Sequence, residues 1–434
     1  MSLDKSTSKW EWVKAKDFMI FNPRESIKKG TLVKNIPMDK IEPKTKEISD
    51  YEITEFKSGT KFRNGDTLMA RITPCLENGK ISQVNMLDDN EIGCGSTEFI
   101  VLREKENVSD KEFIYYLSQS EFFKEPAIKS MVGSSGRQRV QRDVIENLDI
   151  YVPPLETQKK IGKLLSLFDK KISLNKKINK NLEEQIETVY NSFFVYYDGF
   201  SKEELEECEI GLIPKEWNLL TLGEVTTQIK QKVGNEDYKV FSAVNTGNLI
   251  LSEEYFDKQV FSKSIEKYIV VKQKEFAYNP ARVNIGSIGR NDFDYDGCVS
   301  PVYVAFKVEE GYENFMNMFI KSNRFNQWVI TLASGSVRQT LNYSDFSIIK
   351  IAYPPKDLIE KFNIIYENYY EVINHNNSMI SNLENIRDIL LPKLMSGEID
   401  VSKINCDFEN IAHFMIFSFK KIIGYLGLYF IRFL

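Results

Sequence analysis

The stretch PPLETQKKIGKLLSLFDKKISLNKKINKNLEEQIETVYNSFF, residues 153–194, decides the architecture of this chain. Two prolines open it, and proline fits a helix entrance but cannot continue a strand ladder. Behind them, apolar side chains recur in alternating steps of four and three residues, which is the heptad spacing of a coiled coil. The pattern predicts a helix on the order of 50 Å long, at about 1.5 Å per residue, that serves as a spacer and not as a core helix. The seam consists of Ile161, Leu165, Phe168, Ile172, Leu182, Ile186, Val189 and Phe193, with Asn175 and Asn179 in its two gaps.

The same pattern recurs 201 residues later. This offset carries Pro153-Pro154 onto Pro354-Pro355 and Asn175 onto Asn376. Further upstream the offset becomes 204, which indicates short insertions or deletions in loops. The chain is therefore an internal repeat in which an α/β unit is followed by a long helix, twice.

We predict an α+β fold with two α/β units in tandem pseudo-repeat, separated by two long helices that carry the seam of a coiled coil. In each unit we expect one helix between its last strands: SDKEFIYYLSQSEFF in the first and NFMNMFIKSNRFNQWVI in the second. Antiparallel pairing would bring Asn175 and Asn376 together, where their amides could bond each other and fix the register. The alternative is that both asparagines face solvent. We expect Pro392 to kink or end the second helix. The predicted segments are 1–152 and 201–352 for the units, 153–200 and 353–403 for the helices, and 404–434 for an apolar tail.

Composition excludes several classes of protein. The chain is 42% hydrophobic and 27% charged, so it can bury a core and is not disordered. Five cysteines without a CxxC pair and only two histidines argue against structural zinc and multi-histidine catalysis, and they favour a cytoplasmic location. The first twelve residues lack the apolar run of a signal peptide. The net charge is −5, and no segment is polybasic. Nucleic-acid contacts would need locally placed basic residues or a partner.

Two Ser/Gly turns carry the binding chemistry that we can recognise: MVGSSGRQR at 131–139 and LASGSVRQT at 332–340. Arginine and glutamine read guanine and adenine edges, while serine hydroxyls and loop amides suit phosphate oxygens. Arg71 and Arg282 occupy a second place that we interpret as matched. The alternative is that these are ordinary solvated arginines. The candidate DNA-binding residues are Arg71, Lys80, Ser134, Ser135, Arg137, Gln138, Arg139, Arg282, Ser336, Arg338 and Gln339.

Four stretches resemble the specificity subunit of type I restriction–modification enzymes. They are KFRNGDTLMARIT (61–73), NLDIYVPPLETQKKIGKLL (147–165), GLIPKEWNLLTLGEV (211–225) and LENIRDILLPKLMSGEIDV (383–401). The resemblance implies that each α/β unit is a target-recognition domain for one half of a split site in double-stranded DNA. It also implies that the two helices pair as an antiparallel coiled coil, which sets the gap between half-sites and holds two methyltransferase subunits. Restriction/translocase subunits would join this complex. S-adenosylmethionine, ATP and Mg²⁺ would belong to these partners, with no cofactor in this chain and no membrane role.

Two other readings remain. A non-enzymatic coiled-coil scaffold for protein partners explains the repeat and the acidic charge, but not the recurring Arg-Gln. An enzyme, such as a nuclease or methyltransferase fused to a specificity module, lacks support because neither a GxxxxGK[ST] loop nor a dinucleotide fingerprint occurs. Residues 406–434 depart from the resemblance because they extend past the usual end of such chains. We expect a frameshifted or readthrough tail there, because Lys420 and Lys421 interrupt a possible membrane span.

Overall fold

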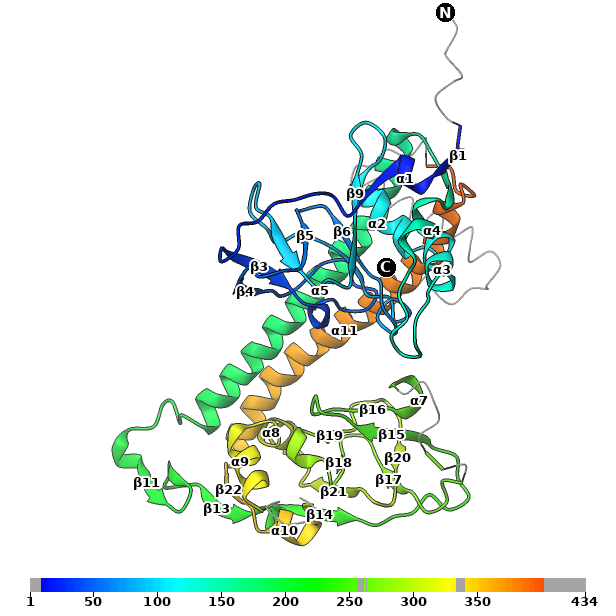
Figure 1. Ribbon diagram of the computed structural model, residues 1–434. Helices are drawn as coiled ribbons and strands as arrows, with labels where there is room; N and C mark the ends of the chain where they lie inside the picture. The colour runs from blue at the N-terminus through cyan, green and yellow to red at the C-terminus, as the bar shows by residue number, and fades with distance from the viewer. Residues whose placement is uncertain (1–8, 256–260, 263, 333–339, 402–434) are drawn as a thin grey trace, which may run out of the picture. The chain divides into compact units, whose positions relative to one another are not determined.

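The computed structural model describes residues 9–255, 261–262, 264–332 and 340–401. The chain divides into two compact units (Figure 1). Unit 1 consists of Met1–Lys177 and Asn376–Leu434, and unit 2 of Ile178–His375. The tail predicted at 404–434 lies outside the described residues. No helix in the described part is both long and apolar enough to cross a membrane.

Unit 1 contains two four-stranded sheets and a two-stranded ribbon. In the first sheet all neighbouring strands are antiparallel, whereas the second contains one parallel pair, β3 with β8. The first has the order β2 (Met19–Phe21), β9 (Phe99–Glu104), β6 (Thr67–Ala70), β7 (Ile81–Gln83). The second has the order β4 (Glu52–Glu55), β3 (Leu32–Ile36), β8 (Gly93–Gly95), β5 (Thr60–Phe62), and the ribbon joins β1 (Glu11–Lys14) to β10 (Asp149–Val152).

Unit 2 repeats this topology strand for strand. Its one parallel pair, β15 with β20, takes the place of β3 with β8. The first sheet has the order β14 (Thr226–Ile229), β21 (Val304–Val308), β18 (Phe276–Tyr278), β19 (Ile288–Arg290). The second has the order β16 (Leu249–Leu251), β15 (Lys239–Ala243), β20 (Gly297–Val299), β17 (Ile269–Val271), and the ribbon joins β13 (Asn218–Thr221) to β22 (Lys350–Tyr353). The predicted tandem pseudo-repeat is confirmed, with one extra hairpin, β11 (Leu205–Cys208) and β12 (Gly211–Pro214), in unit 2.

Short helices accompany the sheets in both units. Those of unit 1 are α1 (Ala15–Phe18), η1 (Met38–Lys40), α2 (Lys111–Gln119), α3 (Glu121–Lys129) and α4 (Arg142–Glu146). Those of unit 2 are η2 (Lys202–Glu204), α6 (Leu222–Val225), α7 (Ser252–Tyr255), η3 (Val283–Ile285), α8 (Glu313–Phe319), α9 (Asn323–Leu332) and α10 (Tyr343–Ser347).

The single helix expected in each unit is in fact two helices. In unit 1 the break falls at Ser120, whose backbone is extended between α2 and α3. Its buried hydroxyl donates to the Leu117 carbonyl, a local bond that competes with continuation of the helix. Apolar periodicity alone could not reveal this break, because the pattern continues through it.

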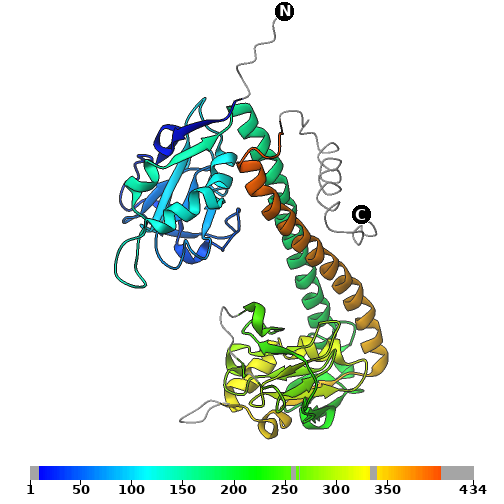
Figure 2. The same cartoon turned by 90° about the vertical axis from the view of Figure 1, so that its right-hand side faces the viewer.

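Two helices of 40 residues each dominate the chain, α5 (Leu155–Phe194) and α11 (Lys356–Met395). Both begin directly after the double prolines, as predicted. α11 continues for three residues beyond Pro392, and Gly397 follows its end with φ +76°. Within unit 1 the first part of α5 runs beside the last part of α11 (Figures 1 and 2). Asp169 meets Arg387 and Lys176 meets Glu384, which is antiparallel pairing.

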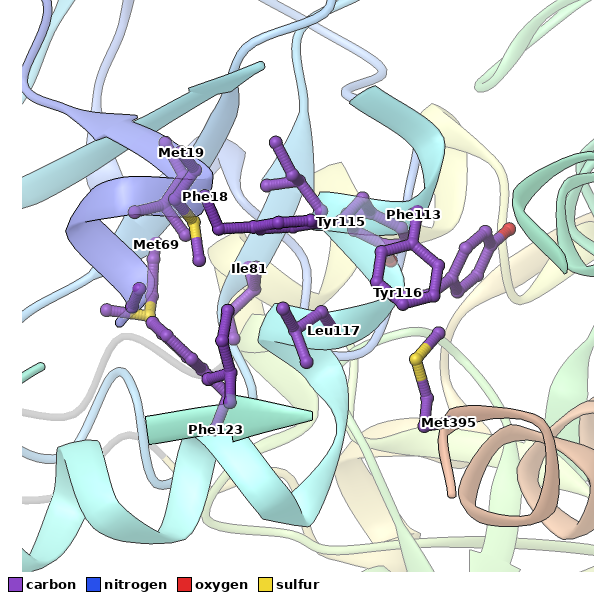
Figure 3. Close-up of a cluster of buried hydrophobic side chains, with 14 of the residues drawn as sticks. Phe18, Met19, Met69, Ile81, Phe113, Tyr115, Tyr116, Leu117, Phe123 and Met395 are labelled. Atoms are coloured by element: carbon purple, nitrogen blue, oxygen red, sulfur yellow. The ribbon is translucent and has the colours of Figure 1, made fainter. Parts of the chain in front are cut away.

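Both helices are core elements, which corrects the prediction of a pure spacer. In unit 1, Leu165 and Phe168 of α5 and Leu394 of α11 belong to the same buried cluster as the helices and first sheet of the α/β fold. Figure 3 shows Met395 of α11 beside the buried side chains of α2, near Tyr116. In unit 2, Tyr190 and Phe194 of α5 pack with Phe362 of α11 in the corresponding core. Heptad spacing identifies the seam but does not show that its ends lie inside folded domains.

An asparagine layer interrupts the apolar seam, as the repeat indicated. Asn175 is 1% exposed, and Asn179 and Asn376 are also buried. The Nδ2 of Asn175 has no hydrogen-bond partner, so Asn175 does not donate to Asn376 as hypothesised. An unpaired buried donor keeps its desolvation penalty of about 1–3 kcal/mol.

Replacing Asn175 with leucine should therefore raise the free energy of unfolding by about 1 kcal/mol, because an unsatisfied amide gives way to an apolar seam residue. Urea unfolding of the full chain, followed by circular dichroism, measures the change. The exposed Asn181→Leu is the control and should shift stability by less than about 0.5 kcal/mol. Equal shifts in the two variants would contradict the prediction.

A buried ion pair joins the two helices in unit 1. Arg387 Nη1 lies 2.6 Å from Asp169 Oδ1, with side chains 12% and 7% exposed. The Tyr116 hydroxyl of α2 donates to the other oxygen of Asp169. Burial, and then the charge of Asp169, raise the pKa of Tyr116 well above its ordinary value, so the phenol stays a neutral donor. This network connects α2, α5 and α11.

Removing one partner of this pair leaves a buried charge, so Arg387→Leu should lower the free energy of unfolding by about 3–5 kcal/mol. The double variant Arg387→Leu/Asp169→Leu should recover at least half of that loss, because neither charge remains. Urea midpoints of both variants and the wild type provide the comparison. A double variant that is less stable than Arg387→Leu would show that the pair itself contributes the stability.

Candidate nucleic-acid interface

The first Ser/Gly turn forms a small hairpin between α3 and α4. Val132 and Arg139 exchange two backbone hydrogen bonds of 3.1 and 2.9 Å, and the Arg137 amide donates to the Ser134 carbonyl at 3.0 Å. Gly136 has φ +77°, a left-handed conformation that side-chain-bearing residues seldom adopt. Ser134, Ser135 and Arg137 are exposed at its tip. We call residues 131–139 the recognition loop.

The base of the recognition loop is held by an ion pair. Arg139 Nη2 lies 2.6 Å from Glu98 Oε1, and Arg139 Nε donates to both oxygens of the same carboxylate. These hydrogen bonds, with the nearby charges of Arg139 and Arg71, hold the pKa of Glu98 below its ordinary value. The Gln138 carbonyl accepts from the Thr73 amide, which joins the loop to the segment that follows β6. Arg139 therefore acts as an anchor, while Arg137 remains available to a ligand.

Sequence reasoning missed Glu98. The offset of 204 places Val302 at the matching position of unit 2, and the offset of 201 places Thr340 opposite Arg139. Because neither partner recurs, comparison of the two halves carries no signal for this ion pair. Only the fold brings the residue before β9 to the base of the loop.

Arg71 and Lys80 do not lie at the tip of the loop. Arg71 follows β6, its backbone bonds Glu98 and Val140, and its buried Nε has no partner in the described part of the chain. Lys80 Nζ donates to the Met38 carbonyl at 2.9 Å. Both side chains are half-buried, so they contribute to the frame around the loop more than to its exposed surface.

In unit 2 the predicted residues Ser336, Arg338 and Gln339 lie outside the described residues. Arg282 is exposed directly before η3. The interpretation that it matches Arg71 is wrong. The Val140 amide donates to the Arg71 carbonyl, whereas Leu341, at the equivalent position 201 residues later, donates to the Pro280 carbonyl. The register of β18 therefore puts Pro280 in the place of Arg71, and Arg282 two residues further into the following turn.

No group of His, Cys, Asp and Glu side chains in the described ranges is arranged to hold a metal ion. The features present are an exposed arginine, hydroxyl groups and backbone amides on an anchored hairpin. Such groups bind phosphate oxygens and base edges.

Comparison with known proteins agrees with this chemistry. A family model described as the type I restriction modification DNA specificity domain matches residues 7–184. The HindI specificity subunit of Haemophilus influenzae, a type I restriction enzyme subunit, is 25% identical over 428 residues, covering 81% of this chain and 90% of the relative. Residues 7–184 of this chain are therefore similar to the DNA specificity domain of type I restriction–modification enzymes.

Two further matches describe the extent of the likeness. The EcoAI specificity subunit of Escherichia coli is 33% identical to this chain over 169 residues, which is 37% of this chain and only 28% of the relative. The crystal structure of a type I restriction–modification system S subunit from M. genitalium aligns with a TM-score of 0.54 at 15% identity, over 91% of this chain and 98% of that one. The structural match shows a shared fold across both units.

Loss of the ion pair between Arg139 and Glu98 should loosen the recognition loop. Because the pKa of Glu98 is lowered in the folded state, its contribution is complete at pH 7 and is lost only as the pH falls through that lowered value. Glu98→Gln should raise the rate of tryptic cleavage after Arg137 several-fold at pH 7, measured by mass spectrometry of the native chain. Glu125→Gln, which removes an exposed pair with Lys129 on α3, should leave the rate unchanged. Equal rates in all three proteins would show that the pair does not restrain the loop.

Proposed function

We propose that this chain is the DNA-reading subunit of a type I restriction–modification complex and that each α/β unit contacts one half of a bipartite site in double-stranded DNA. The observation that carries the proposal is the repeated topology. The two units have the same strand order, and in the sequence of each a Ser/Gly segment with Arg-Gln precedes the last strand. Because Glu98, Arg139 and Arg71 have no counterparts in unit 2, we expect the two half-sites to differ.

The partners follow from the family and are part of the proposal. Two methyltransferase subunits would dock on α5 and α11, and restriction/translocase subunits would complete the assembly. S-adenosylmethionine, ATP and Mg²⁺ would bind to those partner subunits. The complex would work in the cytoplasm, and this chain would recognise DNA without catalysing a reaction. The antiparallel pairing of the helices supports a role in setting the gap between half-sites.

A non-enzymatic scaffold for protein partners is the alternative function. It accounts for the paired helices, but it does not require an exposed arginine on an anchored hairpin. A scaffold would also show no dependence of DNA affinity on salt concentration, whereas a DNA-binding subunit would.

Co-expression with a methyltransferase subunit of the same system, followed by mapping of methylated bases, tests the function. We expect a split motif of two short half-sites around a fixed gap. Arg137→Ala should relax sequence preference in one half-site only and Arg338→Ala in the other, each by about 1–3 kcal/mol of discrimination at the affected base. A stable complex that methylates no defined motif would contradict a reading role for this chain. A single substitution that relaxes sequence preference in both half-sites would contradict the proposal that each unit contacts one half-site.

A further inference from the structure

A cluster of positive side chains covers two adjacent segments of unit 1. Residues 22–31 connect β2 to β3, and residues 55–63 run from the end of β4 through β5. Together they contain six cationic residues and two carboxylates, in a chain whose net charge is −5. We call the cations the basic patch: Arg24, Lys28, Lys29, Lys57, Lys61 and Arg63.

The two segments are held together by their backbones. Gly30 donates to the Phe56 carbonyl at 3.0 Å, and the Phe56 amide donates to the Thr31 carbonyl at 2.8 Å. Lys61 Nζ donates to the Glu25 carbonyl at 3.2 Å, which ties β5 to the first segment. A small buried cluster of Val33, Phe56 and Cys94 lies beneath, with Ile27 packed against it. The positive side chains therefore project from an ordered surface.

The two carboxylates leave most of the positive charge of this surface unbalanced. Glu25 is largely buried and is already paired with Arg63 and Arg103, each at 2.7 Å. Glu55 is exposed. Four members of the patch, Arg24, Lys28, Lys29 and Lys57, are exposed and make no ion pair within the described residues. Like charges gathered on one surface repel one another unless counterions or a polyanion accompany them.

The surplus is not a property of the fold itself. In unit 2 the connection from β14 to β15, residues 230–238, contains Lys230 and Lys232 but also Glu236 and Asp237. The equivalent connection in unit 1 has three cations and one carboxylate, and that carboxylate is occupied. The same strand order can therefore be connected without excess charge.

We propose that the basic patch is a phosphate-contact surface through which unit 1 holds the DNA backbone, separate from the recognition loop. This rests on the proposed function and adds a second contact region to it. Lysine ammonium groups bind phosphates as point charges without reading sequence, so the patch contributes affinity and salt dependence but no base preference. An acidic surface of a protein partner is the competing occupant.

The test uses the full chain in complex with its methyltransferase subunits and measures duplex affinity against salt concentration. Lys28→Ala/Lys29→Ala should reduce the slope of log K against log salt by about 2, since each phosphate contact contributes about 0.9. Affinity for target and scrambled duplex should fall by the same factor, and the methylated motif should not change. Lys28→Arg/Lys29→Arg should restore the slope. Lys16→Ala/Lys129→Ala removes the same charge from exposed positions on α1 and α3 of unit 1 and should leave the slope unchanged.

Each remaining outcome identifies which idea fails. An unchanged slope in Lys28→Ala/Lys29→Ala, with wild-type target preference intact, would overturn the phosphate contact alone. Weaker binding of the methyltransferase subunits by that variant would assign the patch to an acidic protein partner, provided that the salt slope of DNA binding by the assembled complex is unchanged. A wild-type complex without any target preference would overturn the proposed function itself.

Discussion

Burial of the helix ends inside the two α/β cores is the constraint on which the rest of the structure depends. Neither unit closes its core with its own sheets and short helices. Unit 1 takes Ile161, Leu165 and Phe168 from α5 and Leu390 and Leu394 from α11. Unit 2 takes Ile186, Tyr190 and Phe194 from α5 and Phe362 and Tyr366 from α11. The hydrophobic effect stabilises the fold in proportion to the apolar area that is buried. Separating the helices from a unit would expose much of that unit's core and is therefore unfavourable.

In each unit a buried arginine interacts with a long helix, and the two units take this arginine from different elements. In unit 1 the cation is Arg387 on α11, which meets Asp169 of α5 and, through it, Tyr116. In unit 2 it is Arg290 at the end of β19, 4% exposed, which donates to Asn314 and to the Tyr366 hydroxyl of α11. The guanidinium also lies over the Tyr366 ring at 5.7 Å. A common backbone frame thus tolerates a change in which element supplies the charge, provided that the charge is paired or hydrogen-bonded.

An acidic protein can bind DNA when its positive charges are local. The recognition loop presents Arg137 while Glu98 neutralises Arg139, so one residue separates the free charge from the anchoring charge. The basic patch gathers further cations beside Glu25, whose carboxylate is already paired with Arg63 and Arg103. Net charge therefore describes this chain poorly, because the relevant quantity is which cations lack a carboxylate partner.

The sequence by itself determined the tandem repeat, the starts of both long helices after double prolines and the heptad seam that the two helices share. Each of these features follows from the local spacing of residues or from a constant offset between repeats. Both can be recognised without knowing which distant residues are in contact. Only the tertiary structure decided that the helix ends are core, that Ser120 divides α2 from α3, that Pro280 and not Arg282 matches Arg71, and that Glu98 anchors the recognition loop. Those features depend on strand register and on side chains brought together from distant segments. A one-residue shift in register exchanges which residues meet, and neither periodicity nor composition records that choice.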